Sequence, residues 1–133
     1  MRTVNKVTLI GNVTRDPAVK TTESGKKIAL FTIATNRYYK TSDGENKSES
    51  EFHNCVVWGN LAERVEKFLL KGKLIYAEGR LRTRVIEKDD GTKLYKTEVV
   101  ISHLIFLNKK SDFETIETDD YESEYSTEES DKF

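Results

Sequence analysis

The stretch from Glu51 to Gly72, EFHNCVVWGNLAERVEKFLLKG, most constrains what this chain can fold into. Its first part, residues 51–59, predicts a β-strand, because Phe, Val and Trp lie between a charged start and a glycine. Alternation along a strand places on one face Phe52, Asn54, Val56 and Trp58, and on the other His53, Cys55 and Val57. Large rings on the face opposite small apolar residues indicate either a second packing layer or a platform for flat ligands.

A short helix is expected directly after this strand. Asn60 is the predicted N-cap, with Glu63 at the capping-box position. Gly72 is the predicted terminator of the helix. The apolar stripe of the helix is expected to consist of Leu61, Val65, Phe68 and Leu69.

Four further strands are expected at residues 4–13, 27–37, 73–85 and 95–107. Residues 18–26 are expected to form a connection and residues 38–50 a polar loop, with turns at Asp43-Gly44 and Asp90-Gly91. Gly79 in mid-strand predicts a sharp bend, as at the corner of a barrel. The all-β order of five strands, with one short helix between the third and fourth, is typical of the OB-fold, a Greek-key barrel that binds single strands and sugars. Other small barrels share this strand count.

The net charge of −1 conceals two segments of opposite charge. Residues 111–133 contain ten acidic residues and one basic residue, so residues 1–110 contain 13 acidic and 21 basic residues. We expect residues 1–110 to form one folded domain. Residues 111–133 are expected to be a disordered acidic tail, because their apolar content is too low to offset the entropy of ordering. A basic body with an acidic tail indicates a nucleic-acid partner.

Several classes of protein are disfavoured by composition. No apolar run approaches the length of a membrane span, and the N-terminal residues do not resemble a signal peptide or a transit segment. One cysteine and two histidines make a disulfide or a metal cluster unexpected. The carboxylates available for a nuclease lie in expected turns at Asp43, Glu45, Asp89 and Asp90. We therefore expect a non-enzymatic protein without metal or cofactor in a reducing cytoplasm; a mitochondrial protein whose presequence has been removed is the alternative.

Aromatic and cationic residues interleave along the expected strands. A protein that binds single strands without reading sequence needs rings for stacking and cations along the backbone. Such groups are Arg37-Tyr38-Tyr39-Lys40, then Phe52 and Trp58, then Tyr76 with Arg80, Arg82 and Arg84, and finally Tyr95 and Lys96. Alternatively, Phe52 and Trp58 pack under a loop or at a subunit contact, and the three arginines form a solvated strand face. Stacking also leaves open an OB-fold RNA-binding or primosome-type factor.

Separate blocks of the chain, in order, resemble the bacterial and mitochondrial single-stranded DNA-binding protein family over residues 1–107. The blocks are NKVTLIGN at 5–12, RDP at 15–17, FTIAT at 31–35, FH, VWG and LAE within 52–63, LKG at 70–72, YAEGRLRTR at 76–84, and Tyr95 with TEVV at 97–100. The resemblance implies an OB-fold homotetramer that coats single-stranded DNA during replication, recombination and repair. It implies, in addition, association with the nucleoid.

The resemblance also implies roles for individual residues. It implies base stacking on Tyr39, Phe52 and Trp58, to which the interleaving pattern adds Tyr76 and Tyr95. It implies phosphate contacts at Arg2, Lys6, Lys71, Arg82 and Arg84, to which the pattern adds Arg37 and Arg80. His53 matches a histidine that contacts a neighbouring subunit. Many members carry a stacking tryptophan after the Arg-Thr-Arg run, where this chain has Val85 and Ile86.

The tail resembles the family only at its tip. Asp131 and Phe133 match the acidic, Phe-ending tip that docks partner enzymes in bacterial members, but Lys132 stands where those members have proline. The alternative is an electrostatic shield that competes with DNA for the basic body.

Overall fold

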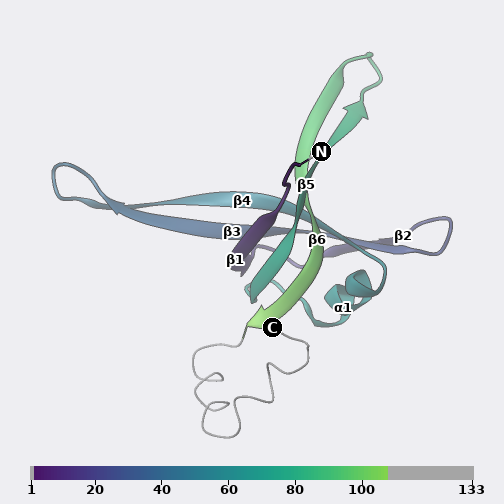
Figure 1. Ribbon diagram of the computed structural model, residues 1–133, viewed down its shortest axis with the longest axis horizontal. Helices are drawn as coiled ribbons and strands as arrows, with labels where there is room; N and C mark the ends of the chain where they lie inside the picture. The colour runs from purple at the N-terminus through teal and green to yellow at the C-terminus, as the bar shows by residue number, and fades with distance from the viewer. Residues whose placement is uncertain (1, 108–133) are drawn as a thin grey trace, which may run out of the picture.

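The computed structural model describes residues 2–107, in which six strands form one sheet and a single helix lies between β4 and β5 (Figure 1). The elements are β1 (Val7–Val13), β2 (Ala18–Thr21), β3 (Lys27–Lys40), β4 (Asn46–Trp58), α1 (Asn60–Phe68), β5 (Leu74–Glu87) and β6 (Lys93–Leu107). The strand order is β1-β5-β6-β4-β3-β2, and a further pairing of β1 with β3 closes the sheet into a barrel. The five long strands and the helix confirm the predicted OB-fold.

The core fills the inside of this barrel. Alternate residues of the long strands point inward and are almost completely buried, among them Phe31, Ile33, Val57 and Ile75. From α1, the side chains that join this cluster are Ala62 and Val65, followed by Leu69 just after the helix. Within residues 2–107, no helix has the length and hydropathy needed to cross a membrane. The predicted tail at 111–133 lies outside the described residues.

Two hairpins extend beyond the barrel as long arms, one formed by β3 and β4 and the other by β5 and β6 (Figure 1). The expectation of a polar loop at residues 38–50 is therefore wrong. Strand pairing continues to Lys40 opposite Asn46, and the turn is confined to the residues between them, including the predicted Asp43-Gly44. The arm has few apolar residues and no core of its own. Cross-strand pairs such as Arg37 with Glu49 support its pairing instead.

A short strand was missed within the expected connection at residues 18–26. β2 pairs with β3 along four residues at the edge of the sheet. Only Val19 of this strand is partly buried and packs on the core. One inward side chain is too weak a signal for an alternation argument.

The ends of α1 also differ from the expectation. Its N-cap is Gly59, with a φ of 66°, and no side chain caps the helix, so neither Asn60 nor Glu63 has the predicted capping role. The helix ends at Phe68, and Gly72 lies in the turn that follows. Phe68 is exposed rather than part of the buried stripe. The neighbouring strands set these ends: Gly59 donates its N–H to the carbonyl of Lys27 and Gly72 donates to that of Val13.

Gly79 lies where β5 bends across β6, as predicted. The register of the two strands shifts between Glu78 and Gly79, which marks a β-bulge. A Cβ atom on Gly79 would stand 2.0 Å from the carbonyl oxygen of Val100. Only glycine therefore permits this approach of the two backbones.

The substitution Gly79→Ala is expected to destabilise the fold by about 3 kcal/mol or more, because the clashing atom belongs to backbone and cannot rotate away. Gly44→Ala is the matched control, since a Cβ there meets nothing within 4 Å. Its cost is limited to the left-handed backbone, about 1–2 kcal/mol. Urea denaturation at one protein concentration measures both. Equal costs for the two variants would contradict this account of the bend.

Candidate nucleic-acid interface

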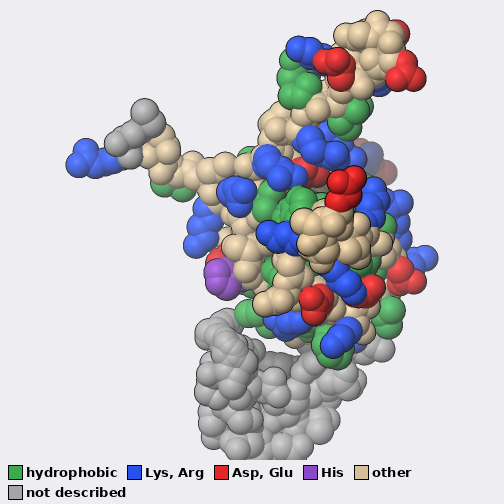
Figure 2. Space-filling model, turned by 90° about the vertical axis from the view of Figure 1, so that its right-hand side faces the viewer, with side chains coloured by type: hydrophobic (Ala, Val, Ile, Leu, Met, Phe, Trp, Pro, Cys, Tyr) green, Lys and Arg blue, Asp and Glu red, His purple; other side chains and the backbone are tan. Residues whose placement is uncertain are grey.

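A groove of about 560 Å³ lies on the outer face of the barrel, beside the base of the β5–β6 arm. Lys and Arg side chains gather around apolar side chains below this arm (Figure 2). The lining residues come from β2, β3, β4, β5 and β6: Lys20, Ile28, Leu30, Val56, Trp58, Arg82, Thr83, Arg84, Val85 and Glu98. The groove thus combines apolar side chains and a tryptophan ring with cations, the combination that single-stranded nucleic acid requires.

Trp58 and Phe52 stand on the outer face of β4. Trp58 is half-buried in the groove opposite Ile28, and the Lys26 ammonium lies 5.7 Å from the centroid of its ring. Phe52 pairs with the small Ala34 and is 65% exposed. Neither ring is completely buried in this subunit. The alternative that both rings pack under a loop therefore does not apply to the single subunit. The alternation predicted for β4 places both rings on the side opposite the buried Cys55 and Val57.

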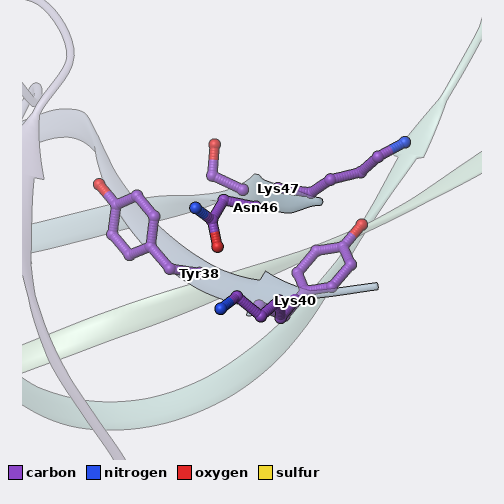
Figure 3. Close-up of a pocket in the computed structure, with 6 residues that line it drawn as sticks. Tyr38, Lys40, Asn46 and Lys47 are labelled. Atoms are coloured by element: carbon purple, nitrogen blue, oxygen red, sulfur yellow. The ribbon is translucent and has the colours of Figure 1, made fainter. Parts of the chain in front are cut away.

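The β3–β4 arm carries two tyrosines on opposite faces. Tyr38 lies opposite Ser48 and, by strand alternation, shares the outer face with Phe52 and Trp58. Its side chain is 77% exposed. Tyr39 lies on the other face with Lys47, and the Arg37 guanidinium covers its ring at 4.7 Å. Figure 3 shows Tyr38, Lys40 and Asn46 on one side of the hairpin and Lys47 extending from the other.

Arg82 and Arg84, two of the predicted phosphate contacts, line the groove from β5. Arg82 donates a hydrogen bond from Nη2 to Oε1 of Glu98 at 2.7 Å, and Arg84 Nε lies 3.3 Å from the same oxygen. Glu98 is almost completely buried, with a relative exposure of 3%. A single carboxylate therefore holds both guanidinium groups at the floor of the groove.

Tyr76 belongs to a different part of the outer face, where β5 lies between β1 and β6. Its hydroxyl donates to Glu78 at 2.7 Å. This hydrogen bond raises the pKa of Tyr76 and lowers the pKa of Glu78. The same carboxylate lies 3.8 Å from Lys6 Nζ and 3.7 Å from His103 Nδ1. Tyr76 and Lys6 are thus engaged in a polar cluster and do not line the groove.

The other predicted contacts are spread over the surface. Tyr95 is exposed on the β5–β6 arm opposite Val85. Arg80 is exposed on β5 opposite Val100, next to the groove residues. Two further predicted cations, Arg2 and Lys71, are also exposed but do not line the groove.

His53 and Cys55 lie on the face of β4 that turns inward. His53 is half-buried, and its Nε2 lies 2.9 Å from Thr35 Oγ1. Burial raises the pKa of the Cys55 thiol to about 12, which suits a core residue and not a nucleophile. Residues 2–107 contain no group of three or more His, Cys, Asp or Glu side chains placed to hold a metal ion.

Sequence reasoning missed Lys20 and Glu98 as groove residues, and it missed Lys26, whose ammonium lies over the Trp58 ring. It also did not select Tyr38 over the adjacent Tyr39 as the ring on the outer face. Lys20 and Lys26 belong to a segment that was expected to be a connection. The face of Tyr38 could have been predicted from the sequence, because counting alternate residues from the apolar Phe31 places Tyr38 on the opposite, outer face. The meeting of Glu98 with two arginines follows from the pairing of β5 with β6, which no local motif reveals.

Single-stranded DNA-binding proteins are similar to this chain in sequence and in fold. The model of the single-strand binding protein family matches residues 4–107. Single-stranded DNA-binding protein 3 of Listeria innocua is 43% identical over 107 residues, covering 80% of this chain and 66% of that protein. The single-stranded DNA-binding protein of Staphylococcus aureus is 42% identical over 112 residues, covering 84% of this chain and 70% of that protein. The chain therefore spans about two thirds of the length of these relatives.

Two solved structures are also similar to this one. The Plasmodium falciparum SSB in complex with ssDNA has a TM-score of 0.75 and 33% identity, covering 81% of this chain and 98% of that chain. A deletion mutant of the single-stranded DNA-binding protein from Thermus aquaticus has a TM-score of 0.72 and 30% identity, covering 81% of this chain and 52% of that chain. On the family match and on these identities, the chain belongs to the single-strand binding protein family.

Proposed function

We propose that this chain binds single-stranded DNA without reading its sequence, and that it does so without enzymatic activity. The observation that carries the proposal is the row of rings on the outer face of the β3–β4 ribbon, next to the cations of the groove. Family membership supports the same function. Phe52 and Trp58 supply the rings nearest the barrel, and Arg84 and Lys20 supply charge in the groove that Trp58 lines.

The rings provide stacking surfaces that any base can use. Each base stacked on an aromatic side chain contributes about 1–3 kcal/mol. Trp58 and Phe52 are six residues apart on β4, roughly 20 Å at about 3.4 Å per residue. Tyr38 continues the row farther along the arm. A single strand lying along the ribbon would therefore meet successive rings, while exposed cations neutralise its phosphates.

In the cell, we propose that the protein coats single strands during replication, recombination and repair. The assembly we propose is a homotetramer in which His53 lies at a subunit contact. We further propose that Asp131 and Phe133, which lie outside the described residues, dock replication and repair enzymes. Mass in solution, with and without a long dT oligomer, tests the tetramer.

Binding of a dT oligomer is expected to quench the fluorescence of Trp58, the only tryptophan of the chain. Trp58→Ala and Phe52→Ala are each expected to weaken binding by about 1–3 kcal/mol, because each removes one stacking surface. Anisotropy of a labelled oligomer measures the affinity, and circular dichroism checks the fold. Phe68→Ala is the matched control, since Phe68 is also an exposed ring, 57% against 65% for Phe52, and lies on α1 away from the groove. Equal losses in Phe52→Ala and Phe68→Ala would overturn the proposed path.

The preference for DNA over RNA is measured by comparing the affinity for dT oligomers with the affinity for U oligomers of equal length.

Tyr38→Ala and Tyr39→Ala form a second pair of matched variants, since the two residues are adjacent but face opposite sides of the arm. The family resemblance favours Tyr39 as the stacking residue, whereas the geometry of this subunit favours Tyr38. We expect Tyr38→Ala to weaken binding of a dT oligomer by about 1–3 kcal/mol and Tyr39→Ala to have a smaller effect. The reverse order in the same anisotropy assay would show that the strand follows the other face of the arm.

A further inference from the structure

Glu98 is a buried carboxylate in a groove that is otherwise suited to anionic ligands. It projects from β6 directly opposite Arg82 of β5 and lines the groove together with Trp58. Its relative exposure is 3%, whereas Arg82 and Arg84 have side-chain exposures of 35% and 47%. Burial of a carboxylate is costly unless cations and hydrogen bonds compensate for it. Here two arginines supply that compensation.

The contacts of Glu98 occupy the groups that a phosphate would need. Arginine binds phosphate through charge-assisted N–H donors. Arg82 already directs Nη2 to Glu98 Oε1 at 2.7 Å, and Arg84 Nε lies 3.3 Å from the same atom. Arg82 also has a buried Nε without a hydrogen-bond partner among the described residues, which indicates that it is held within the floor. Arg84 is the more exposed of the two and is the guanidinium that an incoming strand can reach.

We propose that Glu98 competes with DNA phosphate for Arg84, and that Arg82 holds the carboxylate in place for this competition. The inference rests on the proposed binding of single-stranded DNA. In the unbound protein, one negative charge partly neutralises two arginines at the floor. A bound strand must then displace or share Glu98 before its phosphate pairs fully with Arg84. Glu98 thereby limits the affinity of the groove and favours release of the strand.

The test compares the salt dependence of binding in the parent protein and in Glu98→Gln. Glutamine keeps the shape of the side chain and an oxygen acceptor for Arg82, but it removes the charge that competes for Arg84. Each phosphate that pairs with a cation of the protein steepens the plot of log affinity against log salt by about 0.7 for a single strand. One additional phosphate–arginine pair should therefore raise the affinity of the variant relative to the parent about fivefold when NaCl falls from 0.5 M to 0.05 M. Anisotropy of a labelled dT oligomer provides the affinities.

Glu87→Gln is the matched control, because it makes the same change in net charge on the exposed part of β5 without lining the groove. Its salt dependence should equal that of the parent. The tighter binding of Glu98→Gln should also disappear when it is combined with Arg84→Gln. An increase of the same size in Glu87→Gln, or an increase that survives the loss of Arg84, would overturn the proposal.

A salt dependence in Glu98→Gln that is equal to or weaker than that of the parent would also overturn the inference. It would show that Glu98 only positions the arginines. If Glu98→Gln loses the fold by circular dichroism, Glu98→Asp replaces it, since the shorter side chain withdraws the carboxylate from Arg84; a salt dependence unchanged from the parent would then be the negative result. The underlying function is tested separately by Trp58→Ala. If that variant weakens binding while Glu98→Gln changes nothing, only the role of Glu98 fails.

Discussion

Burial of the inward side chains fixes the register of β3 against β4, and this register decides which side chains face outward. On the inner side, Phe31 pairs with Cys55 and Ile33 pairs with His53. Phe31 is 2% exposed and Ile33 is 0% exposed. A slip by one residue would move every side chain of a strand to the other face. Loss of the core contacts would therefore also remove the row of rings outside. Stability and the proposed binding surface thus depend on the same packing.

The arms extend this register beyond the core. No buried residue supports the outer part of the β3–β4 hairpin, but its hydrogen bonds continue the pairing set within the barrel. Because the register is unchanged along the arm, Tyr38 lies on the same face of the ribbon as Phe52. The groove at the base of the other arm, in contrast, is built on the packed floor that holds Trp58 and Glu98.

The arginines of the groove and of the β3–β4 arm are paired with carboxylates and do not form a uniform positive patch. Arg82 and Arg84 share Glu98, and Arg37 of the distal arm is paired with Glu49. Such pairs keep basic side chains ordered and reduce the charge that solvent and other anions encounter. The count of 21 basic residues in positions 1–110 therefore overstates the cationic groups that are available to a ligand.

The sequence by itself determined the fold class and the two faces of residues 52–58, with rings on one face and Cys55 and Val57 on the other, because alternation and glycine positions are local properties of a strand. It also placed the bend at Gly79 and the turn at Asp43-Gly44. It was wrong about the ends of α1 and the length of the arms, since hydrogen bonds to distant strands set both. Only the tertiary structure decided that Lys20, Lys26 and Glu98 meet Trp58 and the arginines. These residues are brought together because β5, β6, β4, β3 and β2 are neighbours in the sheet, and the pairing of β4 with β6 joins strands that are far apart in the chain.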